Sequence, residues 1–264
     1  MARFDDKVAV IVGGGTLIGR TIARAFRDEG AGVAAGDIDD AAGEALAAEL
    51  GERGWYRRLD LAKDDDIAGF AAGALARFGR IDFLVNVACS YVDGGVASTR
   101  EQWLQSLNVN VAGAALMVKA VHAELKRNRG VVINFGSVAA KGARSDTLAY
   151  PTSKAAVLHM SRCMALALAP DGIRVNTVSP GWTWSRPLVE RTGDDRAWAQ
   201  RAAAPLHMTR RFAEPEEVAQ CVLFLCSPAA SCVTGADLAA DGGYAAMGPD
   251  RGMSSGNQLL ATKS

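Results

Sequence analysis

The chain has 264 residues, enough for one α/β domain with a single large core or for two small domains. Its 29 Lys and Arg residues equal its 29 Asp and Glu residues, so charge gives no reason to expect a nucleic-acid or membrane partner. No Pro/Gly/Ser-rich linker or low-complexity segment divides the sequence, and we expect a single domain. We find no hydrophobic signal region near Met1 and no apolar run long enough to span a bilayer, which favours a cytoplasmic protein.

The five cysteines favour a reducing compartment. They form no Cys-x-x-Cys pair, lie in mostly apolar surroundings and are odd in number, which indicates reduced, packed thiols rather than disulfides or a zinc site. They are Cys89, Cys163, Cys221, Cys226 and Cys232. The histidines His122, His159 and His207 are scattered; we place the first two on helices, and we expect no bound metal.

The first element predicted along the chain is a buried strand at Val8–Val12, followed by the glycine-rich segment Gly13–Gly19. Residues 20–29 then show a helical period, with apolar side chains at Ile22, Ala23, Ala25 and Phe26. A strand, a glycine turn and a helix in this order are the setting of a dinucleotide site. Glycines allow the backbone to approach a pyrophosphate, and the helix start offers free N–H groups. A merely flexible turn is the simpler alternative.

The next predicted strand, residues 32–36, ends at Asp37, about twenty residues beyond the glycine turn. A carboxylate there can accept both ribose hydroxyls and repels a 2′-phosphate. No Lys or Arg precedes Leu17 in the glycine turn or directly follows Asp37, so the sequence favours NAD(H) over NADP(H). Alternatively, Asp37 caps the helix predicted at residues 40–50, although Asp39 or Asp40 could do so instead.

Two more strands are predicted at residues 55–59 and 81–85, the first ending at Asp60 and Leu61 and the second running into Asn86. Helices are predicted at residues 63–78 and 101–127. Asn110 lies within the second helix among apolar neighbours, where a polar amide is most often a core side chain with its hydrogen bonds satisfied.

A fifth predicted strand, residues 131–135, leads to Ser137 and then to a helix that carries Tyr150 and Lys154. Four residues apart on a helix, Tyr150 and Lys154 share one face. An ammonium near a phenol favours the phenolate and lowers the phenol pKa from about 10 toward neutrality. Such a pair also occurs by chance on solvated helices. Pro151 is tolerated only in a first turn, which places Tyr150 at the helix start.

A sixth strand is predicted at residues 173–178, a helix at 214–225, and a seventh strand and turn at 233–243. The segment 182–214 contains three of the five Trp residues, which either pack this segment onto the domain or line a pocket. The polar residues 244–264 form a tail that is either partly disordered or in contact with a neighbouring subunit.

The order of these motifs resembles the short-chain dehydrogenase/reductase family over nearly the whole chain. The motifs are the glycine turn, Asp37, Asp60, Asn86, Asn110, Ser137, Tyr150, Lys154, Pro180-Gly181 and Asp241-Gly-Gly243. The alternating apolar runs and helical periods predict an α/β fold with a doubly wound, seven-stranded parallel sheet of Rossmann type. We expect one NAD-binding and catalytic domain at residues 1–243, with a substrate lid at 182–214, and a tail at 244–264.

The sequence departs from the family pattern at four positions. Val12 and Leu17 replace the first Thr and the middle Gly of Thr-Gly-x-x-x-Gly-x-Gly. Val87 and Cys89 replace the second Asn and the Gly of Asn-Asn-Ala-Gly. We interpret Cys89 as a packing residue, with a reactive thiol as the alternative.

The resemblance implies a catalytic set of Asn110, Ser137, Tyr150 and Lys154. In it, Tyr150 exchanges the hydroxyl proton, and Lys154 lowers the pKa of Tyr150 and binds the nicotinamide ribose. Ser137 orients the substrate oxygen, and Asn110 holds a relay water. The cofactor-binding residues implied are Gly13, Leu17, Ile18, Gly19, Asp37, Asp60, Leu61, Asn86, Tyr150, Lys154, Pro180, Gly181, Thr183 and Ser185. Asp60 is expected at the adenine edge, and Ser185, with Thr183 as a rival, at the carboxamide or phosphate.

The function implied is NAD(H)-dependent interconversion of a secondary alcohol and a ketone. We expect a bulky apolar, aromatic or alicyclic substrate because Trp182, Trp184 and Trp198 lie in the lid. The lid arginines 186, 191, 196 and 201 are interpreted as a solvated face; otherwise they hold an anion, as in a sugar or hydroxy-acid dehydrogenase. An epimerase or dehydratase that retains NAD, and a non-catalytic dinucleotide-binding regulator, are further alternatives. Helices 101–127 and 148–169 resemble those that the family pairs between subunits, which implies a homotetramer.

Overall fold

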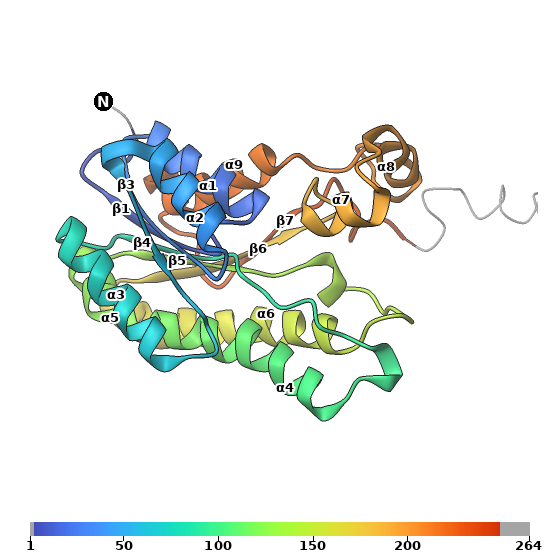
Figure 1. The fold of residues 1–264 in the computed structure, drawn as a ribbon, viewed down its shortest axis with the longest axis horizontal. Helices are drawn as coiled ribbons and strands as arrows, with labels where there is room; N and C mark the ends of the chain where they lie inside the picture. Colours follow the sequence, from blue (N-terminus) through green and yellow to red (C-terminus); the bar gives the residue numbers. More distant parts are fainter. Residues whose placement is uncertain (1–2, 249–264) are drawn as a thin grey trace, which may run out of the picture.

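Seven parallel strands form one sheet in the computed structural model, which describes residues 3–248. The spatial order is β3-β2-β1-β4-β5-β6-β7, and the direction of winding reverses between β1 and β4 (Figure 1). The strands are β1 (Val8–Val12), β2 (Gly32–Asp37), β3 (Gly54–Arg58), β4 (Phe83–Asn86), β5 (Val131–Phe135), β6 (Arg174–Pro180) and β7 (Asp237–Ala240). This arrangement confirms the predicted doubly wound Rossmann-type sheet.

Helices cover both faces of the sheet (Figure 1). One face carries α1 (Leu17–Asp28), α2 (Asp40–Leu50) and α9 (Pro215–Cys226), and the other carries α3 (Asp64–Phe78), α5 (Ala114–Asn128) and α6 (Ala149–Leu168). Helix α4 (Arg100–Leu107) precedes α5, while α7 (Arg186–Thr192) and α8 (Arg196–Ala203) lie near the ends of β6 and β7.

A separate core on each face holds these layers together. Ile22, Phe26 and Val222 are fully buried on the first face, and Phe70 and Met117 on the second. The central strands β1 and β5 are buried throughout, as their continuous apolar runs predicted. Each large apolar side chain buried in this way contributes about 1.5–3 kcal/mol to stability. The rigid sheet presents its carboxyl ends, where the candidate residues lie.

The long helix predicted at residues 101–127 is interrupted. A π-helical segment, Asn108–Gly113, joins α4 to α5 and contains Asn110; single π-helical turns of this kind are frequent at functional sites. The combined helix 100–128 is long and apolar enough, by length and composition alone, to cross a membrane, so the sequence-based statement that no such run exists was wrong. Met117, Val121 and Leu125 of this helix are buried in the domain, as in a core helix of a globular protein.

All five cysteines are free thiols, but only part of the packing prediction holds. Cys226 is buried, and Cys89 and Cys221 are half-buried, whereas Cys163 and Cys232 are exposed. His122 and His159 lie on α5 and α6, as predicted. Most of the predicted tail lies outside the described residues.

Candidate active site

The glycine turn is built so tightly that side chains cannot replace its hydrogens. Gly13 has a φ of +90°, and a Cβ there would lie 2.6 Å from the backbone nitrogen of Ala88. A Cβ on Gly19 would lie 2.0 Å from the Gly13 carbonyl oxygen. Thr16 caps α1 by accepting a hydrogen bond from the Gly19 N–H at 3.0 Å. The turn therefore holds the start of α1 directly against the end of β1, which is the geometry needed to receive a pyrophosphate.

The two predicted cofactor residues between these glycines differ in their surroundings. Leu17 is the first residue of α1, and its side chain is 38% exposed. Ile18 is half-buried and packs against the core on the face of the sheet that α1, α2 and α9 cover. Leu17, which stands where the resembled family has glycine, thus begins α1 with its side chain partly in solvent.

Asp37 binds the glycine turn directly. Its buried carboxylate accepts hydrogen bonds from the Gly15 N–H at 2.8 Å and the Asp39 N–H at 3.0 Å. Asp39, not Asp37, caps α2 by accepting from the Ala42 N–H at 3.1 Å. The capping alternative for Asp37 is therefore wrong. Because a carboxylate has about four acceptor positions, Asp37 retains capacity for ribose hydroxyls.

Three further predicted cofactor residues lie at or just beyond the ends of β3 and β4. Asp60 accepts a hydrogen bond from the Ala62 N–H at 3.0 Å, and the neighbouring Leu61 is buried. Asn86 donates to Asn134 Oδ1 at 2.8 Å, but its own buried Oδ1 has no hydrogen-bond partner among the described residues. An unpartnered buried acceptor is costly, so its presence beside the glycine turn fits a site that receives a donor from a ligand.

The predicted catalytic side chains meet at the end of β5. Ser137 follows β5, and Tyr150 is the second residue of α6. Ser137 lies close enough to the Tyr150 phenol to act on its pKa, which it lowers. One turn along α6, Lys154 is buried; its Nζ lies 5.8 Å from the centre of the Tyr150 ring and donates to the Phe135 carbonyl at 2.8 Å. The structure thus brings Ser137, Tyr150 and Lys154 together, as predicted.

The predicted lowering of the Tyr150 pKa by Lys154 is not seen. Burial is the largest influence and raises the pKa of the Tyr150 phenol above its usual range, and the nearby Cys89 thiol acts in the same direction. Hydrogen bonds with Ser137 and Tyr91 oppose this rise. The sequence placed Lys154 correctly but could not show that its ammonium would be held by the Phe135 carbonyl.

Asn110 is a fully engaged core amide in this structure. Its Oδ1 accepts from the Ser90 N–H at 2.6 Å, and its Nδ2 donates to the Ser90 carbonyl at 3.0 Å and to Ser153 Oγ at 2.9 Å. Ser153 Oγ in turn donates to the Tyr150 carbonyl at 2.7 Å. These contacts agree with the simpler interpretation of Asn110, and the water-holding role stays a prediction.

The remaining predicted cofactor residues follow β6. Pro180 ends the strand, and the Gly181 N–H donates to the Ala240 carbonyl at 3.1 Å. Thr183 is buried with its hydroxyl directed to the Gly181 carbonyl at 3.3 Å. Ser185 stands at the N-cap of α7, and its side chain makes no capping bond. Of the two rivals, Ser185 has the hydroxyl better able to serve a ligand.

The lid tryptophans mostly pack the lid onto itself. The Trp184 ring stacks on Phe212 at 5.4 Å, and the Arg196 guanidinium lies 4.9 Å from the centre of the Trp184 ring. Trp198 is 49% exposed. Arg186, Arg191, Arg196 and Arg201 are all exposed, as expected for a solvated face. Arg196 in addition packs against these rings and pairs with Glu214.

Two residues of the β4–α4 loop escaped the sequence analysis. Tyr91 stacks on Tyr150 with ring centres 4.9 Å apart and is 55% exposed. Asp93 accepts hydrogen bonds from the backbone of α6. Neither residue belongs to a motif that can be recognised in the sequence. The one signal that the sequence offered was the group of polar and aromatic residues that directly follows the Asn86 segment. Within residues 3–248, no three His, Cys, Asp or Glu side chains are grouped to hold a metal, and the expectation of no metal stays a prediction.

Comparison with known proteins places this chain in a family. A family model described as enoyl-(acyl carrier protein) reductase matches residues 15–245. A 2,5-dichloro-2,5-cyclohexadiene-1,4-diol dehydrogenase of Sphingobium indicum is 36% identical over 94% of this chain and 100% of its own length. A D-threitol dehydrogenase of Mycolicibacterium smegmatis is 37% identical over 92% of this chain and 94% of its own.

The fold has an equally close match. A 3-ketoacyl-(acyl-carrier-protein) reductase from Brucella melitensis, solved with NADH, superposes with a TM-score of 0.83 at 30% identity, covering 92% of this chain and 99% of its own. The chain belongs to the short-chain dehydrogenase/reductase family. It is an oxidoreductase of that family, and the predictions of this enzyme class and of an NAD(H) cofactor are confirmed.

Proposed function

We propose that this protein interconverts a cyclic or otherwise bulky secondary alcohol and its ketone. The observation that carries the proposal is the meeting of Ser137, Tyr150 and Lys154 at the end of β5. The glycine turn and Asp37 lie at the same carboxyl edge of the sheet, after β1 and at the end of β2. A phenol and a neighbouring hydroxyl can together hold a substrate oxygen and exchange a proton with it.

Each residue has a defined part in this proposal. NAD(H), when bound, accepts or supplies the hydride. Tyr150 exchanges the proton of the substrate hydroxyl, while Ser137 orients the substrate oxygen. The Lys154 ammonium has three donor positions, of which the Phe135 carbonyl occupies one, so it can also bind a ribose hydroxyl. Asn110 supports this arrangement by fixing Ser90 and Ser153.

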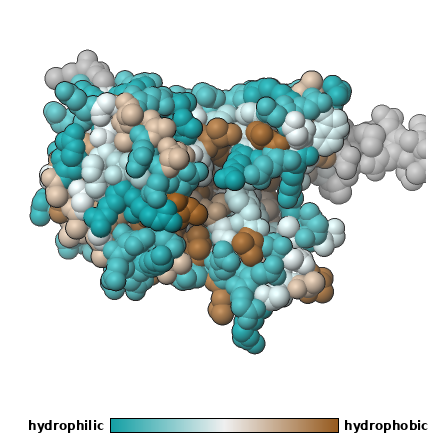
Figure 2. Space-filling model, in the orientation of Figure 1, coloured by the Kyte–Doolittle hydropathy of each residue, from teal (hydrophilic) through white to brown (hydrophobic). Residues whose placement is uncertain are grey.

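The substrate class is inferred from the aromatic surface next to Tyr150. Tyr91 presents an exposed ring stacked on Tyr150, whereas the Trp184 ring is occupied by Phe212 and Arg196. Figure 2 shows apolar side chains gathered in a hollow of the visible face. An alicyclic ring suits the exposed aromatic face of Tyr91, and one relative acts on a cyclohexadiene diol.

A polyol or sugar substrate is the second candidate, because another relative is a threitol dehydrogenase. An anionic substrate is less favoured, since Arg186 pairs with Glu190 and Arg196 with Glu214. Panels of cyclic alcohols, 1-phenyl-type alcohols, threitol and sugar acids would be compared by kcat/KM with NAD and NADP, following absorbance of the reduced cofactor. We expect cyclic alcohols to be preferred by about ten- to a hundredfold. Preference for the anionic set would contradict the proposed substrate class.

The same assay separates the reaction types. Net reduction of NAD excludes an epimerase or dehydratase that retains its cofactor through the cycle. A protein that binds NAD(H) and turns over none of the panel would instead support the regulatory alternative. The cytoplasmic location, the lid at 182–214 and the boundary at residue 243 also stay predictions.

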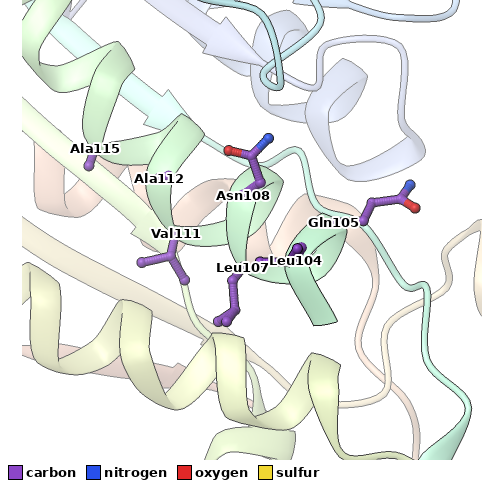
Figure 3. A pocket seen from close by; sticks show the side chains of 7 residues that line it. All are labelled: Leu104, Gln105, Leu107, Asn108, Val111, Ala112 and Ala115. Carbon is purple, nitrogen blue, oxygen red and sulfur yellow. The ribbon is translucent and has the colours of Figure 1, made fainter. Parts of the chain in front are cut away.

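We also propose that the chain forms a homotetramer. Leu104, Leu107 and Val111 line an open apolar groove along α4 and the π-helical segment, in which Leu107 and Val111 point toward α6 (Figure 3). Leu104 is 60% exposed, and Leu166 on α6 is 80% exposed. A second copy of these helices would cover both side chains. Light scattering should give the mass of four 27.6 kDa chains, and a monomeric mass at micromolar concentration would contradict the proposal.

A further inference from the structure

Helix α6, which carries Tyr150 and Lys154, begins without a cap from its own sequence. Its N-cap residue is Leu148, whose apolar side chain makes no capping hydrogen bond. Its third residue is Pro151, which has no N–H to offer. Helices α1, α2 and α4, by contrast, are capped by Thr16, Asp39 and Thr99 at their own starts. An uncapped first turn leaves N–H groups without partners and makes the helix less stable.

Asp93 supplies the missing cap from the β4–α4 loop. One carboxylate oxygen accepts from the Tyr150 N–H at 2.8 Å, 57 residues further along the chain. The other accepts from the Leu148 N–H at 3.0 Å, the Gly95 N–H at 2.9 Å and Ser98 Oγ at 3.2 Å. Both carboxylate oxygens are therefore engaged, on two different segments of the chain.

The ionised form of Asp93 is the one that fits here. Burial alone would raise the pKa of the Asp93 carboxyl, but the N–H groups of Leu148, Tyr150 and Gly95 outweigh it and hold the pKa below its usual range. A negative charge at a helix N-terminus is also favoured by the helix dipole.

The Asp93 contact joins two segments of the candidate site, the β4–α4 loop and the start of α6. Asn110 fixes one end of the β4–α4 loop at Ser90, and Asp93 fixes the loop to α6. Between them lies Tyr91, whose ring stacks on Tyr150. The start of α6 and the loop facing it are thus held as one unit, and proton transfer requires such placement because a 1 Å error can cost about 10²-fold in rate.

We propose that Asp93 is a positioning residue, which fixes Tyr150 by capping α6 from a distant loop. This inference rests on the proposed function for the role of Tyr150 in proton transfer. The near-isosteric variant Asp93→Asn tests it, because an amide NH2 group replaces one carboxylate oxygen and cannot accept the hydrogen bond from the Tyr150 or the Leu148 N–H group that this oxygen received. We expect kcat to fall about ten- to a hundredfold, while the Kd for NADH changes less than about twofold.

Asp82→Asn is the matched control. Asp82 directly precedes β4, whereas Asp93 lies in the loop that follows it. The buried carboxylate of Asp82 accepts a hydrogen bond from the Val8 N–H at 3.0 Å and pairs with Lys7 and Arg80. This variant should lower Tm at least as much as Asp93→Asn and leave kcat nearly unchanged. Equal losses of kcat in the two variants would mean that Asp93 acts only through stability, and would overturn the inference.

Hydrogen exchange gives a readout that does not depend on any substrate. Amides of residues 148–154 should exchange faster in Asp93→Asn than in the wild type or in Asp82→Asn. Unchanged exchange would overturn the inference even in an active enzyme. A wild-type protein that turns over no alcohol would contradict the proposed function. Hydrogen exchange at residues 148–154 would still show, independently of that result, whether Asp93 fixes Tyr150.

Discussion

The two halves of the candidate site are held by contacts of very different range. In the cofactor half, Thr16 binds Gly19 three residues away, and Gly15 binds Asp37 twenty-two residues away. In the catalytic half, Asp93 reaches Tyr150 over 57 residues, and Asn110 reaches Ser153 over 43. The contacts of the glycine turn with Thr16 and Asp37 lie within one β-α-β unit, whereas those of the catalytic half form only after several units have packed together.

This difference predicts where each half is vulnerable. The cofactor half depends on backbone approach, so an added methyl group at a glycine should damage it directly. The catalytic half depends on hydrogen bonds between separate loops and helices, so conservative changes far from the chemistry should reduce turnover without preventing NAD(H) binding. The following predictions, from the largest expected effect to the smallest, test that contrast.

Tyr150→Phe should separate the halves most sharply. Loss of the phenolic hydroxyl removes the proton-transfer group but keeps the ring that stacks on Tyr91, so we expect kcat to fall about 10²–10⁴-fold. The Kd for NADH, measured by fluorescence titration, should change less than about twofold. Tyr56→Phe is the control, because its hydroxyl binds the Asp37 carbonyl and the Asp40 carboxylate, away from Tyr150. A Tyr150→Phe enzyme that keeps more than a tenth of the wild-type rate would refute the assignment.

Gly19→Ala tests the cofactor half. A Cβ 2.0 Å from the Gly13 carbonyl oxygen cannot be accommodated unless the turn moves, and overpacking of this kind costs about 1–3 kcal/mol or more. We expect a lower Tm and weaker NADH binding. Gly142→Ala is the matched control, since nothing lies within 4 Å of a Cβ at that position. Similar Tm values for the two variants would show that the turn is less rigid than described.

The same contrast explains what the sequence could predict. The strands, the helix faces and the glycine turn follow from local periodicity, so the sheet and the position of Asp37 were predicted correctly. Ser137, Tyr150 and Lys154 were located by their order along the chain. The partners of Lys154, Asn110 and Asp93 were missed because each contact joins segments whose approach depends on tertiary packing.

Asp37→Ala should change cofactor choice rather than catalysis. The variant loses acceptors for the ribose hydroxyls and also the repulsion of a 2′-phosphate. Charged hydrogen bonds of this kind contribute about 1.5–3 kcal/mol, so we expect the NAD preference in kcat/KM to narrow by at least about tenfold. Measuring kcat/KM with NAD and NADP for both proteins tests this. Equal or better use of NADP by the wild type would contradict the role given to Asp37.

Tyr91→Phe should give the smallest effect, visible as a shift in pH dependence. Burial raises the pKa of Tyr150, and the Tyr91 hydroxyl lowers it. Removing that hydroxyl should therefore raise the pKa of Tyr150 further, while the Tyr91 ring stays stacked on Tyr150. Alcohol oxidation requires the phenolate, and its rate falls about tenfold per pH unit below the pKa, so the rising limb of kcat/KM should move to higher pH.

Ketone reduction provides the internal control for this shift. Reduction requires the protonated phenol, which a higher pKa preserves, so its kcat/KM at neutral pH should be nearly unchanged in Tyr91→Phe. Measuring both directions between pH 6 and about 10 distinguishes an altered pKa from general damage, which would slow both. An oxidation limb that stays in place or moves to lower pH would show that Tyr91 contributes its ring to this site and not its hydroxyl.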